Sequence, residues 1–183
     1  MSSSPIPAGL QRIRWIAHCV RAMVLIAMAT VIGFHAMFWT NAGLVERTAR
    51  SEWGLKHALQ FDPGSRGAGF AVNLPLALLT LYALWCLWRL FSGYLRGDVF
   101  TDTAARVMRR MGQSVIAIAI AMPLTDTATI LALTLGNPAG QRMLTFQLGS
   151  SHFIVLLCGL VFVALGLVLR EAQRMAQENA EFI

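Results

Sequence analysis

The chain alternates four long apolar segments with shorter polar segments. The apolar segments cover Ala22 to Trp39, Phe70 to Phe91, Ser114 to Leu135 and His152 to Leu169. A helix needs roughly 20 predominantly apolar residues to cross the hydrocarbon core of a bilayer, and all four segments are close to that length. The pattern therefore predicts an all-α integral membrane protein, a four-helix bundle that forms one domain over residues 1–183.

The longest polar segment, Thr40 to Gly69, joins the first two spans. Its first part, GLVERTARSEWGLKHALQ, places a line of apolar or small residues at helical spacing, with polar residues between them. That line consists of Leu44, Thr48, Leu55 and Leu59. The spacing predicts an amphipathic helix that lies on the membrane surface or caps the bundle. The stretch DPGSRGAG that follows is expected to break this helix before the second span.

The polar segment between the second and third spans is rich in arginine and has a helical period. Gly97 is expected to end the preceding helix, and Thr101 or Asp102 to cap the next one by accepting hydrogen bonds from its free N–H groups. The apolar side of that helix consists of Ala104, Val107, Met108, Met111 and Val115. The polar side consists of Arg106, Arg109, Arg110 and Gln113. We expect this basic helix to continue into the third span.

Composition supports a membrane protein and argues against several soluble classes. The chain is 56% hydrophobic and 13% charged, whereas soluble domains carry about 25% charged residues. Four spans and their loops leave no room for a soluble catalytic domain of about 100 residues. A net charge of +6 would suggest nucleic acid in a soluble domain, but these charges flank spans, so no direct contact with nucleic acid is expected.

Cys19, Cys86 and Cys158 form no C-x-x-C pair and are expected to be buried apolar residues.

The placement of lysine and arginine predicts the orientation of the spans. If the N-terminus is inside, ten basic residues lie on the inner side: Arg12, Arg14, Arg21, Arg89, Arg96, Arg106, Arg109, Arg110, Arg170 and Arg174. The other five lie on the outer side: Arg47, Arg50, Lys56, Arg66 and Arg142. Because positive residues concentrate in cytoplasmic segments, both termini are expected in the cytoplasm. The amphipathic helix then belongs to the outer loop, and the basic helix to the inner loop.

Two short stretches resemble a known family. In GDVFTDTAARVMRRMG the residues that carry the likeness are Gly97, Phe100, Thr101, Arg106, Arg109, Arg110 and Gly112. In the tail EAQRMAQENAEFI they are Glu171, Ala172, Arg174, Glu178, Asn179 and Ile183. Both stretches are similar to motifs of an uncharacterised bacterial four-helix membrane family, domain of unknown function 2975. The resemblance implies a bacterial cytoplasmic (inner) membrane location and a small helix-turn-helix regulator as a partner, but no established activity.

The basic residues Arg106, Arg109 and Arg110 are the first candidate for a functional site. One interpretation is a solvated basic turn that meets anionic membrane lipid. The other is a docking surface for an acidic cytoplasmic partner.

Asp126 is the second candidate, because it is the one acidic residue deep inside a predicted span. It lies twelve residues past Ser114, about 18 Å along the helix and therefore near mid-bilayer. Thr125 and Thr127 flank it, and Pro123 is expected to disturb the helix just before it. The carboxyl should face the bundle interior, either as part of a transport or ligand site or as a protonated group bonded to a neighbouring helix. The structural interpretation is favoured because a proton relay needs further intramembrane acids or bases.

His35, His57 and His152 all fall on the predicted outer side, where they would have to converge to hold a metal or haem. No pair has the H-E-x-x-H spacing, so neither a metal nor any other cofactor is expected. The chain also lacks P-loop, dinucleotide-binding and G-x-S-x-G patterns, so no catalytic pair can be nominated and an enzyme is not expected.

Small residues four apart, Ala117 with Ala121 and Ala128 with Ala132, permit close helix contact within the chain or in a homo-oligomer. Taken together, these observations predict a small multi-pass membrane protein of regulatory or interaction type. Transport or ligand binding at Asp126, and haem or metal binding at the histidines, are its alternatives.

Overall fold

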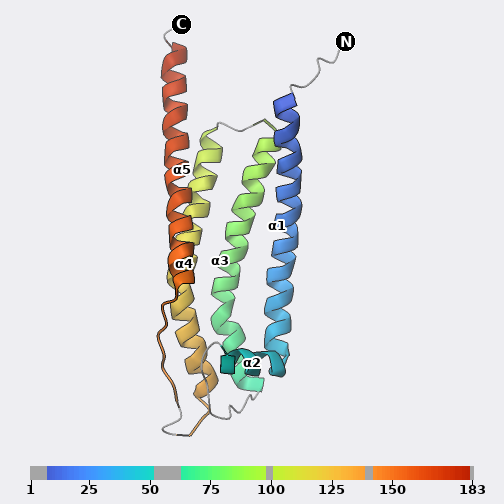
Figure 1. Cartoon of the computed structure of the whole chain (residues 1–183), viewed down its shortest axis with the longest axis vertical. Helices are drawn as coiled ribbons and strands as arrows, with labels where there is room; N and C mark the ends of the chain where they lie inside the picture. Colours follow the sequence, from blue (N-terminus) through green and yellow to red (C-terminus); the bar gives the residue numbers. More distant parts are fainter. Residues whose placement is uncertain (1–7, 52–62, 98–100, 139–141, 182–183) are drawn as a thin grey trace.

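The computed structural model describes residues 8–51, 63–97, 101–138 and 142–181. Within these ranges the chain forms helices and no strand (Figure 1). The helices are α1 (Ala8–Thr40), α2 (Ala42–Ser51), α3 (Pro63–Leu95), α4 (Asp102–Thr134) and α5 (Ser150–Glu181). The predicted all-α class is thereby confirmed.

Helices α1, α3, α4 and α5 are each long and apolar enough to cross a membrane. The three that contain 33 residues are about 50 Å long, whereas the hydrocarbon core is about 30 Å thick. Each helix therefore extends beyond the apolar segment that predicts it. The chain is a multi-pass membrane protein.

The four long helices stand in an open row rather than a closed ring. Each packs on its neighbour in sequence, α1 on α3, α3 on α4 and α4 on α5, while α2 crosses one end beside α1 (Figure 1). Among the described residues, α1 makes no comparable contact with α4 or α5. The start of α1 and the end of α5 lie together at one end, here called the terminal end, and α2 marks the opposite, α2 end. Helices α1 and α5 consequently present much of their apolar surface to the lipid.

At the α2 end, the predicted amphipathic helix is present as α2. Asn41 caps it, because its side-chain Oδ1 accepts from the N–H groups of Gly43 and Leu44 at 3.1 and 3.2 Å. The fully buried residues are Val45 and Ala49, one position beyond the predicted line. The other half of the predicted helix, with Leu55, His57 and Leu59, lies outside the described residues.

The predicted break over DPGSRGAG is wrong from Pro63 onward, because α3 begins there. Proline suits the first turn of a helix, where its missing N–H has no partner to lose. The glycines that suggested a break instead include a packing position. A Cβ at Gly69 would overlap the ring of Trp39, so α1 and α3 approach closely at this point.

At the terminal end, the core lies between α3, α4 and α5. Cys86 and Leu90 of α3 pack against the buried residues Ala104, Val107 and Met111 of α4, and Leu169 of α5 packs against this cluster. The predicted apolar side of the basic helix is confirmed, as is the expected burial of Cys86. Cys158 is exposed on α5, so the expectation that every cysteine is buried is wrong.

Candidate functional site

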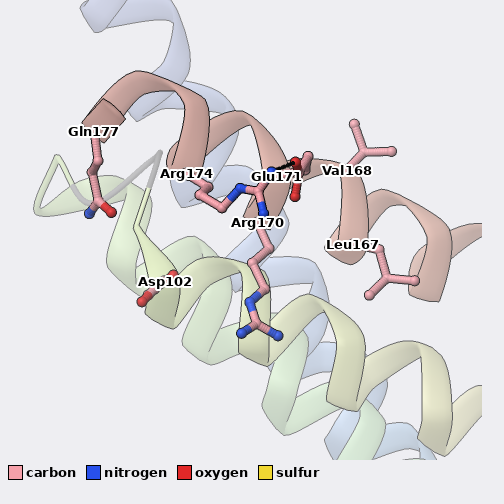
Figure 2. A pocket seen from close by; sticks show the side chains of 7 residues that line it. All are labelled: Asp102, Leu167, Val168, Arg170, Glu171, Arg174 and Gln177. Atoms are coloured by element: carbon pink, nitrogen blue, oxygen red, sulfur yellow. Dashed lines mark ion pairs between the residues drawn. The ribbon is translucent and has the colours of Figure 1, made fainter. Parts of the chain in front are cut away.

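At the terminal end, a groove of about 650 Å³ separates the first turn of α4 from the last turns of α5 (Figure 2). Its lining consists of Asp102, Leu167, Val168, Arg170, Glu171, Arg174 and Gln177. A smaller hollow of about 170 Å³ adjoins it and shares Asp102, Leu167 and Arg170. The smaller hollow adds Arg106 and Arg109 of α4, so the two form one surface, here called the α4–α5 groove.

Local sequence explains where α4 begins. Thr101 is the N-cap, with extended backbone, and its Oγ1 accepts from the N–H of Ala104 at 3.2 Å. Gly97, with a φ of +91°, stands in the turn after α3, where a residue without Cβ is favoured. The predicted helix end and cap are both confirmed, and they place Asp102 in the first turn of α4, at the mouth of the groove.

Glycines hold α4 and α5 at close range below the groove. A Cβ at Gly112 would lie 2.6 Å from the backbone N of Val163 and 2.8 Å from the carbonyl O of Gly159. A Cβ at Gly166 would lie 3.0 Å from the backbone N of Arg109. These approaches leave no space for a side chain, so backbone meets backbone here. The base of the groove is therefore fixed in position.

The charges of the groove are only partly paired. Arg174 contacts Glu171 at 2.8 Å and Glu178 at 3.4 Å, and Arg106 lies 3.9 Å from Asp102. Arg109 and Arg170 have no ion pair among the residues that the structure describes. Figure 2 shows the Arg170 guanidinium reaching toward α4, whereas Arg174 turns along α5 to Glu171. The surface therefore carries a surplus of positive charge at fixed positions.

The structure separates the three arginines that the sequence grouped together. Arg106 and Arg109 line the α4–α5 groove, but Arg110 is exposed and lines neither of its two hollows. Arg170, which no local sequence pattern singles out, lines the smaller hollow together with Arg109. No local pattern in the tail indicates that α5 stands beside the start of α4.

Asp126 lies in a polar contact between α4 and the start of α5. Its Oδ2 is 3.9 Å from Nε2 of His152, and its side chain is 42% exposed, so it is only partly turned to the interior. The Thr127 hydroxyl lies 2.8 Å from the Pro123 carbonyl and 3.2 Å from the Thr145 carbonyl. Neither Asp126 nor Thr127 lines the α4–α5 groove.

A second polar contact, one turn away, joins α3 to α4. Asn73 Nδ2 donates to the Thr129 hydroxyl at 2.7 Å, and that hydroxyl lies 2.7 Å from the carbonyl of Thr125. The helix continues through Pro123, and its midpoint is residue 118. Asp126 is therefore about 12 Å from that midpoint along the helix axis, and its predicted depth in the bilayer stays a prediction.

The structure places the described histidines in different helix pairs. His35 contacts Phe70 between α1 and α3, with ring centroids 4.6 Å apart and the rings tilted by 45°, whereas His152 lies near Asp126. His57 lies outside the described residues. Within the described ranges, no group of three or more His, Cys, Asp or Glu side chains is arranged to hold a metal ion.

Fold and groove together define a class, an all-α multi-pass membrane protein with a charged groove at the end where its termini lie. Within that class the chain matches the family described as "Protein of unknown function (DUF2975)" over residues 36–183, and it belongs to that family. The resemblance inferred from the basic helix and the tail is thereby confirmed. No curated protein and no solved structure matches the chain.

Proposed function

We propose that this chain is a membrane protein of the interaction type and that its α4–α5 groove binds an acidic segment of a soluble protein. The observation that carries the proposal is the groove itself, where Arg109 and Arg170 line the same hollow without an ion pair among the described residues. Guanidinium groups pair with carboxylates through two parallel hydrogen bonds, so an acidic helix or loop suits these positions.

The extension of α5 past its apolar segment supports a protein partner over a lipid. Helix α5 continues twelve residues past the apolar segment that ends at Leu169, about 18 Å beyond it. Glu171, Arg174 and Gln177 are therefore carried away from the lipid on a helix that can meet a soluble surface. With the terminal end in the cytoplasm, as the excess of arginine there favours, the partner is cytoplasmic. A small helix-turn-helix regulator is the partner that the family resemblance implies.

Site-specific photocrosslinking tests this proposal directly. A photoreactive phenylalanine replaces Leu167, which lines the groove, or Leu160, which is exposed two turns deeper on α5 and serves as the control. Crosslinking is carried out in intact cells that express the full chain, and the products are identified by mass spectrometry. We expect a soluble protein at Leu167 and lipid at Leu160.

Removal of the groove arginines tests whether their charges are needed for binding. The Arg109→Gln/Arg170→Gln pair should abolish the protein adduct at Leu167, whereas Arg14→Gln, an exposed arginine of α1, should leave it intact. Lipid adducts at both positions would refute the proposal and favour a lipid-facing groove. A protein adduct that survives removal of both arginines would refute the role given to the charges.

A further inference from the structure

A second basic hollow lies between α1 and α3, apart from the α4–α5 groove. It is lined by the end of α3, which lies at the terminal end. It has a volume of about 500 Å³. Its lining includes Arg21 of α1 and, from the end of α3 and the turn that follows, Trp85, Trp88, Arg89, Ser92 and Arg96. It is called here the α1–α3 hollow.

Among the described residues, the charged side chains that line the α1–α3 hollow are all basic. Arginine stays protonated in proteins, so Arg21 and Arg89 bring two positive charges to this hollow at any physiological pH. Like charges brought together in this way repel one another unless an anion lies between them.

Aromatic rings hold two of these guanidinium groups. Arg21 lies over the ring of Trp88, with its Cζ 4.1 Å from the ring centroid, and Arg89 lies 5.6 Å from the centroid of Trp85. Stacking fixes the face of a guanidinium and leaves its N–H edge available. The Nε of Arg21 is buried and has no acceptor among the described residues. Because that atom is buried, an anion in the hollow would contact the terminal nitrogens of the Arg21 guanidinium.

The donors of the hollow are suited to phosphate. The Ser92 hydroxyl already donates to the Trp88 carbonyl at 2.7 Å, which leaves the guanidinium groups as the donors that face the space. Arginine forks match the tetrahedral oxygens of phosphate by bidentate contact. Arg21 directly precedes the first apolar segment, and Arg89 lies in the last turn of the second. Both therefore stand where lipid headgroups meet the hydrocarbon.

The surface next to the hollow favours a lipid over a free ion. Leu78, Tyr82, Trp85 and Arg89 recur at helical spacing on α3, and the first three are 56%, 40% and 44% exposed. This apolar stripe leads from the hydrocarbon region to the arginines and offers a track for an acyl chain.

We propose that the α1–α3 hollow binds the phosphate group of an anionic phospholipid, whose acyl chain follows the stripe on α3. The bound phosphate accepts from Arg21 and Arg89 and neutralises the repulsion between them. It also bridges α1 to α3 at the terminal end, where α1 has no comparable contact with α4 or α5 among the described residues. This site does not depend on the function proposed for the α4–α5 groove.

Native mass spectrometry of the full-length protein in a non-ionic detergent tests the site. The probes are phosphatidylglycerol, which is anionic, phosphatidylcholine, which carries a compensating cation, and inorganic phosphate as a competitor. We expect the unchanged protein to bind one phosphatidylglycerol in preference to phosphatidylcholine. Millimolar inorganic phosphate should not displace it.

Paired variants separate this site from general attraction to basic surface. Arg21→Gln/Arg89→Gln should weaken binding of phosphatidylglycerol at least about tenfold, because two charge-assisted contacts are lost. Arg14→Gln/Arg110→Gln removes the same charge from exposed positions outside the hollow and should retain the affinity. Equal losses in the two pairs, or no loss in the first, would overturn the proposal. Displacement by millimolar inorganic phosphate would overturn the lipid assignment.

Circular dichroism and gel filtration check that each variant is folded. Should Arg21→Gln/Arg89→Gln fail to fold, Arg89→Gln alone provides the measurement, because Arg89 is exposed and its replacement leaves the packing of Arg21 on Trp88 intact. The single variant should still bind phosphatidylglycerol several-fold more weakly than the unchanged chain. An unchanged affinity would overturn the role of Arg89.

Discussion

The α4–α5 and α1–α3 pairs meet in opposite ways at the terminal end. Helices α4 and α5 touch through backbone, because Gly112, Gly159 and Gly166 leave no room for a side chain between them. Helices α1 and α3 meet through long side chains, with Arg21 stacked on Trp88 beside a hollow of about 500 Å³. The backbone contact fixes the distance between α4 and α5. Between α1 and α3 the side chains leave room that a ligand can occupy. The α4–α5 pair is therefore suited to be a rigid frame, and the α1–α3 pair to respond to what it binds.

The largest effect is expected from a methyl group placed between α4 and α5. Gly112→Ala puts a Cβ 2.6 Å from the backbone N of Val163, so the helices must separate. Overpacking costs about 1–3 kcal/mol, and we take the upper end because the clash is with backbone atoms that cannot rotate away. The better helix propensity of alanine returns about 1 kcal/mol. We expect a net loss of about 2 kcal/mol in the free energy of unfolding, measured by titrating the detergent-solubilised protein with dodecyl sulfate.

Gly33→Ala is the matched control for that substitution. Gly33 lies in α1, and a Cβ at this position would meet no atom within 4 Å, so alanine should cost nothing there. If the two variants had the same free energy of unfolding, the backbone contact at Gly112 would not fix the spacing of α4 and α5. The contrast drawn above between the α4–α5 and α1–α3 pairs would then be wrong.

A smaller effect is expected where α3 is joined to α4. Asn73→Leu removes the hydrogen bond to Thr129, and hydrogen bonds between membrane helices contribute about 1 kcal/mol. Thr80→Val is the control, because the Thr80 hydroxyl donates to Leu76 of its own helix at 2.9 Å. The same titration should show a loss of about 1 kcal/mol for the first variant and clearly less for the second. Equal losses would mean that α3 is not held by a polar contact across the interface.

The smallest effect is expected from the ion pairs of the groove. Arg174 is 66% exposed where it pairs with Glu171 and Glu178, and exposed pairs contribute less than about 1 kcal/mol. Arg174→Gln should therefore change the free energy of unfolding by no more than about 0.5 kcal/mol. A loss as large as that of Gly112→Ala would show that the tail of α5 stabilises the frame rather than extending from it.

Local features of the fold were predictable, because each depends on residues close together in sequence. Thr101 caps α4 through a bond to Ala104, three residues on, and the apolar side of the basic helix follows from a period of 3.6. The start of α3 was missed, because glycines near Gly69 have the composition of a turn. The packing of Gly69 against Trp39 depends on how α1 and α3 are arranged, which no local pattern gives.

The candidate sites were predictable only in part. Arg106 and Arg109 were nominated, but Arg170 and the α1–α3 hollow were not, because no local pattern reports which helices are neighbours. The spacing of alanine pairs such as Ala117 and Ala121 predicts close helix contact there, and these residues are half-buried. The structure places the close contact between α4 and α5 at Gly112 instead.

By itself the sequence determined four apolar crossings, a capped basic helix and an excess of arginine at one end, since length, hydrophobicity and period act over a few turns. Only the tertiary structure decided that Arg109 shares a hollow with Arg170, and Arg21 with Arg89. Residues that far apart in the chain share a hollow when helix spacing allows it. That spacing is set by whether glycine backbone or stacked aromatic and arginine side chains lie between the helices.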